Sequence, residues 1–173
     1  MNTIFVGMIF TLFDIHIKLG GSSLGLLPDF VGYILIYRGL DELMEQSAQF
    51  AKAKPWALGL AVYTGVMYGA ALFGVVRSGV MQFVLGALAH AAALVVTYWI
   101  VAGVREIETA RVRDLLGQRL KNLWLYHTVV SGIAYVFGSI PVIGTIAAIA
   151  AMITGILFLA AFYQSKKQFE QMG

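Results

Sequence analysis

The feature that most constrains the fold of this chain is a set of apolar segments, several of them long enough to cross a lipid bilayer. The segments are Ile4–Leu19, Pro28–Leu43, Trp56–Val76, Val80–Val104, Leu120–Ser139 and Pro141–Tyr163. The third, fourth and sixth contain no Asp, Glu, Lys or Arg, and each reaches the roughly 20 helical residues that span a hydrocarbon core of about 30 Å. The first two are short or interrupted by charge. The sequence therefore predicts an all-α integral membrane protein, a bundle of six transmembrane helices whose first two helices are short or broken.

The composition agrees with a membrane protein of several spans. Charged residues make up 12% of the 173 residues, against about 25% in soluble domains, and the mean hydropathy is +0.81. The residues Met1–Gly7 carry no basic group and no small-residue cleavage site follows, so we expect the first apolar segment to be retained rather than removed as a signal peptide. The chain has no cysteine, which excludes disulfides and thiolate chemistry.

The basic residues are distributed unequally between the two sides of six predicted spans. Lys18 and Arg77 would lie on one side of the membrane. The other side would carry Arg38, Lys52, Lys54, Arg105, Arg111, Arg113, Arg119, Lys121, Lys166 and Lys167. Because loops rich in Lys and Arg stay in the cytoplasm, we predict a multi-pass protein of the cytoplasmic membrane with both termini inside.

The longest polar stretch, Arg105–Lys121, mixes apolar residues with five basic and three acidic ones. This mixture predicts a short amphipathic helix on the inner membrane surface, where it would bind anionic lipid. A nucleic-acid role is the less common outcome of such a pattern, and we predict no nucleic-acid partner.

The segment Leu24–Leu40 carries Pro28, Asp29 and Gly32 where a plain spanning helix would have more Leu or Val. From Pro28 to Arg38 a helix rises about 15 Å, half a hydrocarbon core. Either this helix begins inside the membrane or the protein is thin there. A helix that begins at depth leaves N–H groups that protein, water or a ligand must satisfy. The order Pro-Asp also suits simple capping of a helix N-terminus, since the carboxylate meets the positive end of the helix dipole.

The same residues carry a family resemblance. Leu27–Ile36, read as Leu-Pro-Asp-Phe-Val-Gly-Tyr-Ile-Leu-Ile, is followed by Arg38-Gly39-Leu40 and by Phe50–Pro55. This pattern resembles a group of small uncharacterised membrane proteins of Gram-positive bacteria that share a Leu-Pro-Asp-Phe-(Ile/Val)-Gly-Tyr signature. The resemblance covers about the first third of the chain. It implies a bacterial cytoplasmic membrane protein, and no activity comes with it.

Ionisable and polar groups in the membrane segments are the candidate functional residues, because charge at membrane depth is costly. We predict an outward-facing ligand pocket formed by Asp14, His16, Lys18, Asp29, Tyr33, Arg77 and His90. Asp14 and Lys18 are four residues apart and would pair on one helix face, with Arg77 as a counter-charge. The alternative is that the first three side chains reach into water at the outer interface and that His90 makes one hydrogen bond between helices.

No motif for catalysis or metal binding accompanies these residues. The three histidines lack metal-ligand spacing, and no serine nucleophile with a base is evident. We therefore expect neither an enzyme nor a metal or cofactor site.

The positions of small residues and a weak internal repeat indicate how the predicted helices are organised. Gly65 and Gly69 form a GxxxG step, which lets helix backbones approach closely within one chain or in an oligomer. We predict a single transmembrane domain over residues 1–173. Residues 1–50 and 120–173 could form a parallel repeat of helical hairpins, because both place a proline at the outer turn and a charged extension at the cytoplasmic end.

Two classes of function fit these observations. The first is a small transporter, channel or solute-binding membrane subunit. In size and span count the chain is similar to the substrate-binding subunits of energy-coupling-factor vitamin transporters, but its first segment lacks their run of alanines. The second is a non-transporting scaffold, assembly factor or accessory subunit that acts through helix contacts with a membrane-protein partner or a second copy.

Overall fold

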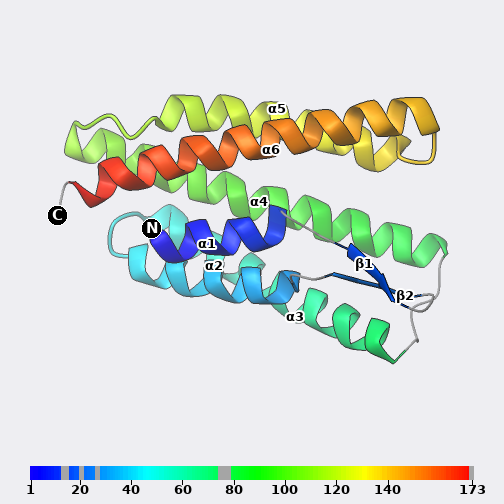
Figure 1. The fold of residues 1–173 in the computed structure, drawn as a ribbon. Helices are drawn as coiled ribbons and strands as arrows, with labels where there is room; N and C mark the ends of the chain where they lie inside the picture. Colours follow the sequence, from blue (N-terminus) through cyan, green and yellow to red (C-terminus); the bar gives the residue numbers. More distant parts are fainter. Residues whose placement is uncertain (13–15, 20–21, 26–27, 74–78, 172–173) are drawn as a thin grey trace. The chain divides into compact units, whose positions relative to one another are not determined.

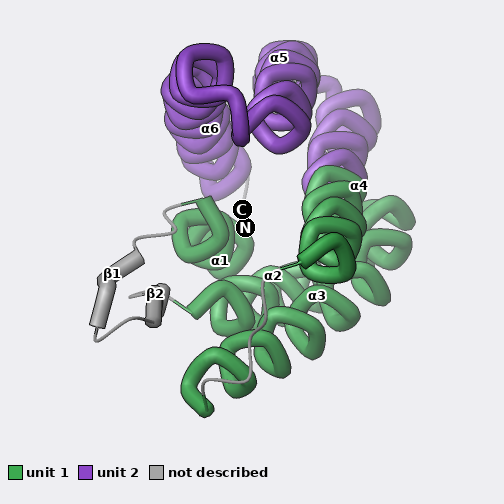
Figure 2. Tube along the Cα trace, turned by 90° about the vertical axis from the view of Figure 1, so that its right-hand side faces the viewer, with its two compact units in different colours: residues 1–96 green, residues 97–173 purple. Residues whose placement is uncertain are grey.

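The computed structural model describes residues 1–12, 16–19, 22–25, 28–73 and 79–171. The elements in chain order are α1 (Asn2–Leu12), β1 (His16–Leu19), β2 (Ser22–Gly25), α2 (Asp29–Leu43), α3 (Ala48–Leu72), α4 (Val80–Arg111), α5 (Gly117–Phe137) and α6 (Pro141–Glu170) (Figure 1). The chain divides into two compact units, residues 1–96 and 97–173, with the boundary inside α4 (Figure 2). The predicted hairpin repeat is not tested by this division and stays a prediction.

Three helices, α3, α4 and α6, are long and apolar enough to cross a membrane. They correspond to the three segments that the sequence predicted as full spans. In the most apolar stretch of these helices, 17%, 17% and 28% of the residues are buried within the protein. Lipid is the solvent that suits the remaining apolar surface. The chain is thus a membrane protein with six helices in its described part, and a bundle of six spans remains a prediction.

The first predicted helix is wrong in its extent. We expected a helix over Ile4–Leu19, but α1 ends at Leu12 and the segment His16–Leu19 is the strand β1. β1 pairs antiparallel with β2, with Leu19 opposite Ser22. The sequence between these two residues is Gly-Gly, which favours two-residue hairpin connections. Consequently Lys18 does not lie on a helix, and the proposed pairing with Asp14 on one helix face fails.

The predicted interfacial helix over Arg105–Lys121 is also wrong. α4 continues to Arg111, and α5 begins at Gly117 after a short linker. The carboxylate of Glu108 ends the helical run, because its Oε1 accepts hydrogen bonds from the backbone N–H groups of Leu115 (2.9 Å) and Gly117 (3.3 Å). A side chain thereby takes over bonds that another helical turn would have made.

In unit 1, α1 lies alongside α2 and α2 lies alongside α3 (Figure 1). Glycines bring the backbones of α1 and α2 into direct contact. A Cβ added to Gly7 would lie 2.6 Å from the carbonyl oxygen of Gly32, and one added to Gly39 would lie 2.6 Å from Cγ1 of Ile4. The Thr3 hydroxyl donates to Glu42 at 3.0 Å. Contact along the whole of α1 therefore leaves no room for side chains between the two helices at these positions.

The predicted GxxxG step of α3 makes no comparable contact. A Cβ on Gly65 would lie 3.6 Å from Phe30, an ordinary van der Waals distance, and one on Gly69 would meet nothing within 4 Å. The close approach in unit 1 therefore depends on α1 and α2.

Unit 2 is built on the α5–α6 hairpin (Figure 1). Trp124 of α5 donates its indole N–H to Thr97 at 3.1 Å. The His127 ring nitrogen Nδ1 lies 3.2 Å from both the Ala151 carbonyl and the Thr154 hydroxyl of α6. Hydrogen bonds between polar side chains thus connect the helices of this unit.

We expect Gly32→Ala to destabilise unit 1. The new methyl group would lie 2.8 Å from the Gly7 carbonyl oxygen, so the helices would have to separate, at a cost of about 1–3 kcal/mol. Gly59→Ala is the matched control, because a Cβ there meets nothing and alanine favours helix. Thermal unfolding of the full chain in detergent measures both. An equal midpoint for the two variants would contradict the close contact.

Candidate functional site

The structure describes three of the seven predicted ligand-binding side chains, Asp29, Tyr33 and His90. Asp14 and Arg77 lie outside the described residues. His16 and Lys18 are described by their backbone, in β1. The described side chains of the predicted outward pocket are therefore Asp29 and Tyr33 of α2 and His90 of α4.

Asp29 is the first residue of α2. Pro28 precedes it in an extended conformation, and the Pro28 carbonyl accepts a hydrogen bond from the N–H of Val31 at 3.0 Å. Oδ1 of Asp29 is buried. This placement fits the predicted helix start, with the carboxylate at the positive end of the helix dipole.

The opposite end of α2 provides a first measure of the depth of Asp29. Asp41 forms an ion pair with Lys54 of α3, and the Lys54 ammonium lies 4.8 Å from the centre of the Tyr37 ring. Paired charges and an aromatic ring are typical of a membrane surface. Asp29 precedes Tyr37 by eight residues, which is about 12 Å of helix, against about 15 Å for half a hydrocarbon core.

α3 provides a second measure of the same depth. Trp56, 48% exposed, follows the Lys54 ion pair and marks the same surface level. Phe30 lies beside Gly65, and its ring centre is 5.7 Å from that of Tyr68. Gly65 follows Trp56 by nine residues, about 13 Å of helix. If α3 crosses the membrane, both helices place the start of α2 near the middle of the hydrocarbon core.

Tyr33 lies one turn after Asp29 and is 8% exposed. Residues four apart share a helix face, so the carboxylate and the phenol belong to one surface of α2. A carboxylate binds cations or protons, and a phenol donates or accepts one hydrogen bond. His90 is half-buried on a different helix, α4, so the structure groups two of the predicted residues on one helix face.

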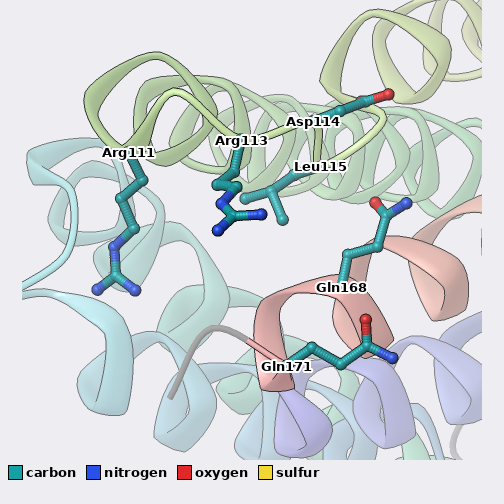
Figure 3. A pocket seen from close by; sticks show the side chains of 6 residues that line it. All are labelled: Arg111, Arg113, Asp114, Leu115, Gln168 and Gln171. Atoms are coloured by element: carbon teal, nitrogen blue, oxygen red, sulfur yellow. The ribbon is translucent and has the colours of Figure 1, made fainter.

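A pocket that the sequence did not predict lies in unit 2, where the end of α4, the linker 112–116 and the end of α6 meet (Figure 3). Its volume is about 600 Å³, and it is lined by Arg111, Arg113, Asp114, Leu115, Gln168 and Gln171. In the sequence, the only sign of this pocket is the pair Arg111 and Arg113, which the predicted amphipathic helix over Arg105–Lys121 places on the membrane surface. A second, apolar pocket of about 390 Å³ lies between α3 and α4 in unit 1 and includes Trp56 and Tyr63.

Neither pocket includes Asp29, Tyr33 or His90. Within the described part of the chain, no cluster of three or more His, Cys, Asp or Glu side chains could hold a metal ion.

We compared the chain with protein-family models, with curated proteins and with solved structures, and none of them matches it.

We predict that Val66 of α3, 65% exposed, faces lipid near the bilayer centre. It follows Trp56 by ten residues, about 15 Å of helix. A nitroxide on a cysteine at position 66 of the protein in lipid vesicles should collide frequently with oxygen and rarely with a water-soluble nickel complex. A nitroxide at the exposed position Lys52 should show the reverse. If the nitroxide at position 66 collides with the nickel complex as often as expected for a residue at the lipid headgroups, the depth inferred along α3 is wrong.

Proposed function

We propose that this chain is a small multi-pass protein of a bacterial cytoplasmic membrane, with both termini inside, and that it binds a polar solute or ion at the start of α2. Transport or channel activity through this site is the function that best fits the proposal. The observation that supports it is the distance of the start of α2 from the level of the Lys54 ion pair, about 12 Å along α2 and about 13 Å along α3, which would place Asp29 near the bilayer centre in a spanning bundle. Ionisable groups at such depth are costly and usually line a site or a path.

The lengths of α1 and α2 give the proposal further support. Their 11 and 15 residues correspond to about 16 and 22 Å of helix, less than a hydrocarbon core of about 30 Å. The β1–β2 hairpin follows α1 and precedes α2, and a strand of four residues adds about 13 Å. Non-helical backbone at membrane depth is tolerated where it is covered by protein or lines a water-filled cavity. Such a cavity would open at Asp29.

The chemistry of the site favours a cation, a proton or a solute with an amino group. Asp29 would supply the negative charge, and the Tyr33 hydroxyl would supply a hydrogen bond one turn away. Asp14, His16, Lys18, Arg77 and His90 remain predicted contributors. Discontinuous helices whose ends point at a bound solute are a recurring device of transporters.

Thiol labelling in the natural cysteine-free background tests this proposal. Single cysteines at positions 29 and 33 should react with an impermeant charged thiol reagent, because a water-filled cavity would reach them. Cysteine at Ile36, on the same helix but 1% exposed and packed among apolar residues, is the control and should stay unlabelled. Protection of position 29 by added cations or amines would then identify the ligand class. If positions 29 and 33 are as unreactive as position 36 while the protein remains folded, the binding proposal fails.

The second candidate function is a scaffold or accessory subunit. The observation that favours it is the open face of Gly69, since the GxxxG spacing often marks helix contacts but a Cβ there would meet nothing in the described chain. Gly69→Ile should then weaken an association between copies, or with another membrane protein, in lipid nanodiscs. An unchanged oligomeric state and unchanged co-purifying proteins would speak against it.

A further inference from the structure

We propose that the polar pocket of unit 2 binds a phosphate group that carries a hydroxyl-bearing substituent. Such chemistry occurs in the headgroup of an anionic glycerophospholipid and in a free glycerol-type phosphate. The pocket involves residues of the second unit alone, so this inference does not depend on the role proposed for Asp29. Three features of the pocket support this inference: its positive charge, the constrained backbone of its linker and a buried acceptor without a partner in the described chain.

The charge of the pocket is positive. Arg111 and Arg113 line it together with one acidic residue, Asp114. Figure 3 shows the Arg113 guanidinium extending from the linker toward α6, whereas the Asp114 carboxylate points away from both arginines. Oδ1 of Asp114 accepts a hydrogen bond from the N–H of Leu116 at 2.7 Å. The acidic group is therefore used by the linker backbone, and the Arg113 guanidinium faces the pocket without an acidic partner in the described chain.

Arginine is well suited to a phosphate, because its planar donors bind two oxygens at once. The Arg111 guanidinium lies 5.6 Å from the centre of the Phe169 ring. This cation–π contact holds the Arg111 side chain near the C-terminal end of α6. For Arg113, no side-chain hydrogen bond or ion pair is found within the described residues. Its donors are therefore available to a ligand.

The backbone that carries Arg113 is held in place. The Arg113 N–H donates to the Glu108 carbonyl at 3.2 Å, and the Leu115 side chain beside it is fully buried. Val112 and Leu116, at the two ends of the linker, have φ angles of 51° and 60°. Side-chain-bearing residues rarely adopt such left-handed conformations, and they recur at ligand sites. Because the backbone of this linker is already constrained, it loses little conformational entropy when Arg113 binds a ligand.

An unused acceptor adds specificity. Oε1 of Gln168 is buried, and no hydrogen-bond partner for it is found in the described chain. Buried acceptors are almost always bonded, so a donor from outside the chain is expected here. Gln168 extends from α6 toward the linker in Figure 3, and Gln171 lies near it at the end of α6. A hydroxyl on the ligand would donate to Gln168 while the phosphate meets the arginines.

The location of the pocket makes both sources of the phosphate accessible. α4 and α6 are candidate membrane spans, and the pocket lies where both end. Lys166 and Lys167 directly precede Gln168, and their ammonium groups lie 5.3 and 5.0 Å from the centre of the Tyr163 ring, as expected at a lipid headgroup surface. Basic pockets at the ends of membrane helices commonly recognise anionic headgroups.

Binding to the purified full chain tests the proposal. In detergent, calorimetry would compare glycerol 3-phosphate with methyl phosphate, and native mass spectrometry would compare retained phosphatidylglycerol with phosphatidylcholine. We expect glycerol 3-phosphate or phosphatidylglycerol to bind preferentially. Arg113→Gln should weaken binding about tenfold, because it removes charged hydrogen bonds. Gln168→Leu should remove the preference for the hydroxyl-bearing probe.

The control is Lys121→Gln, which removes the same charge from an exposed position of α5 outside the pocket. The affinity of this variant for the bound probe should stay within about twofold of that of the natural chain. Retention of phosphatidylglycerol without binding of glycerol 3-phosphate assigns the lipid source, and the reverse assigns a free solute. The proposal is overturned if neither probe binds, or if Lys121→Gln weakens binding as much as Arg113→Gln. Thermal unfolding shows that each variant is folded.

Discussion

The inability of lipid to hydrogen-bond with peptide groups is the constraint on which the rest of this structure depends. Inside a bilayer a chain satisfies its backbone in helices, or it exposes irregular backbone to protein and water. α3, α4 and α6 take the first course, and they are long and apolar enough to do so alone. α1 and α2, with 11 and 15 residues, are too short to span alone, and in the proposed six-span bundle the hairpin between them would need a protein or water environment. The proposed site at Asp29 and the close glycine packing of unit 1 both lie on these two short helices.

Glycines at the α1–α2 contact allow these two short helices to pack tightly against each other. Apolar side chains gain little by leaving lipid for another apolar surface, so close backbone contact supplies the attraction between membrane helices. Gly7, Gly32 and Gly39 provide this contact over the length of α1. Gly32 lies three residues after Asp29, so the contact that joins the helices also fixes the position of the carboxylate. Structure and candidate function are therefore coupled in a single turn of α2.

The sequence predicted the long helices well, because an uninterrupted apolar run has few alternatives. It misplaced the end of α1, since Ile17 and Leu19 extend the apolar character of the segment beyond Leu12. The alternation of Ile17, Lys18 and Leu19 is typical of a strand, but short apolar runs do not separate strand from helix. Of the predicted pocket residues, Asp29 and Tyr33 share one face of α2, whereas His90 lies on α4 and Asp14 and Arg77 lie outside the described residues.

The polar pocket of unit 2 could not be predicted from the sequence, for a different reason. Arg113 and Gln168 are far apart in the sequence, and only the path of α5 and α6 brings them together. No local spacing connects them. The role of Glu108 was equally hidden, because a single carboxylate in a charged stretch resembles any surface residue. Tertiary contacts rather than motifs define this site.

The shortness of α1 and α2 has a consequence for how the protein enters the membrane. The insertion machinery recognises apolar stretches of about 20 residues, one at a time. α1 has 11 residues and α2 has 15, so neither qualifies by itself, whereas α3 does. In the proposed six-span bundle, the residues before Ala48 would then stay at the membrane surface until α3 is synthesised. α1 and α2 would enter as a preassembled pair against α3, which makes the order of synthesis part of the folding pathway.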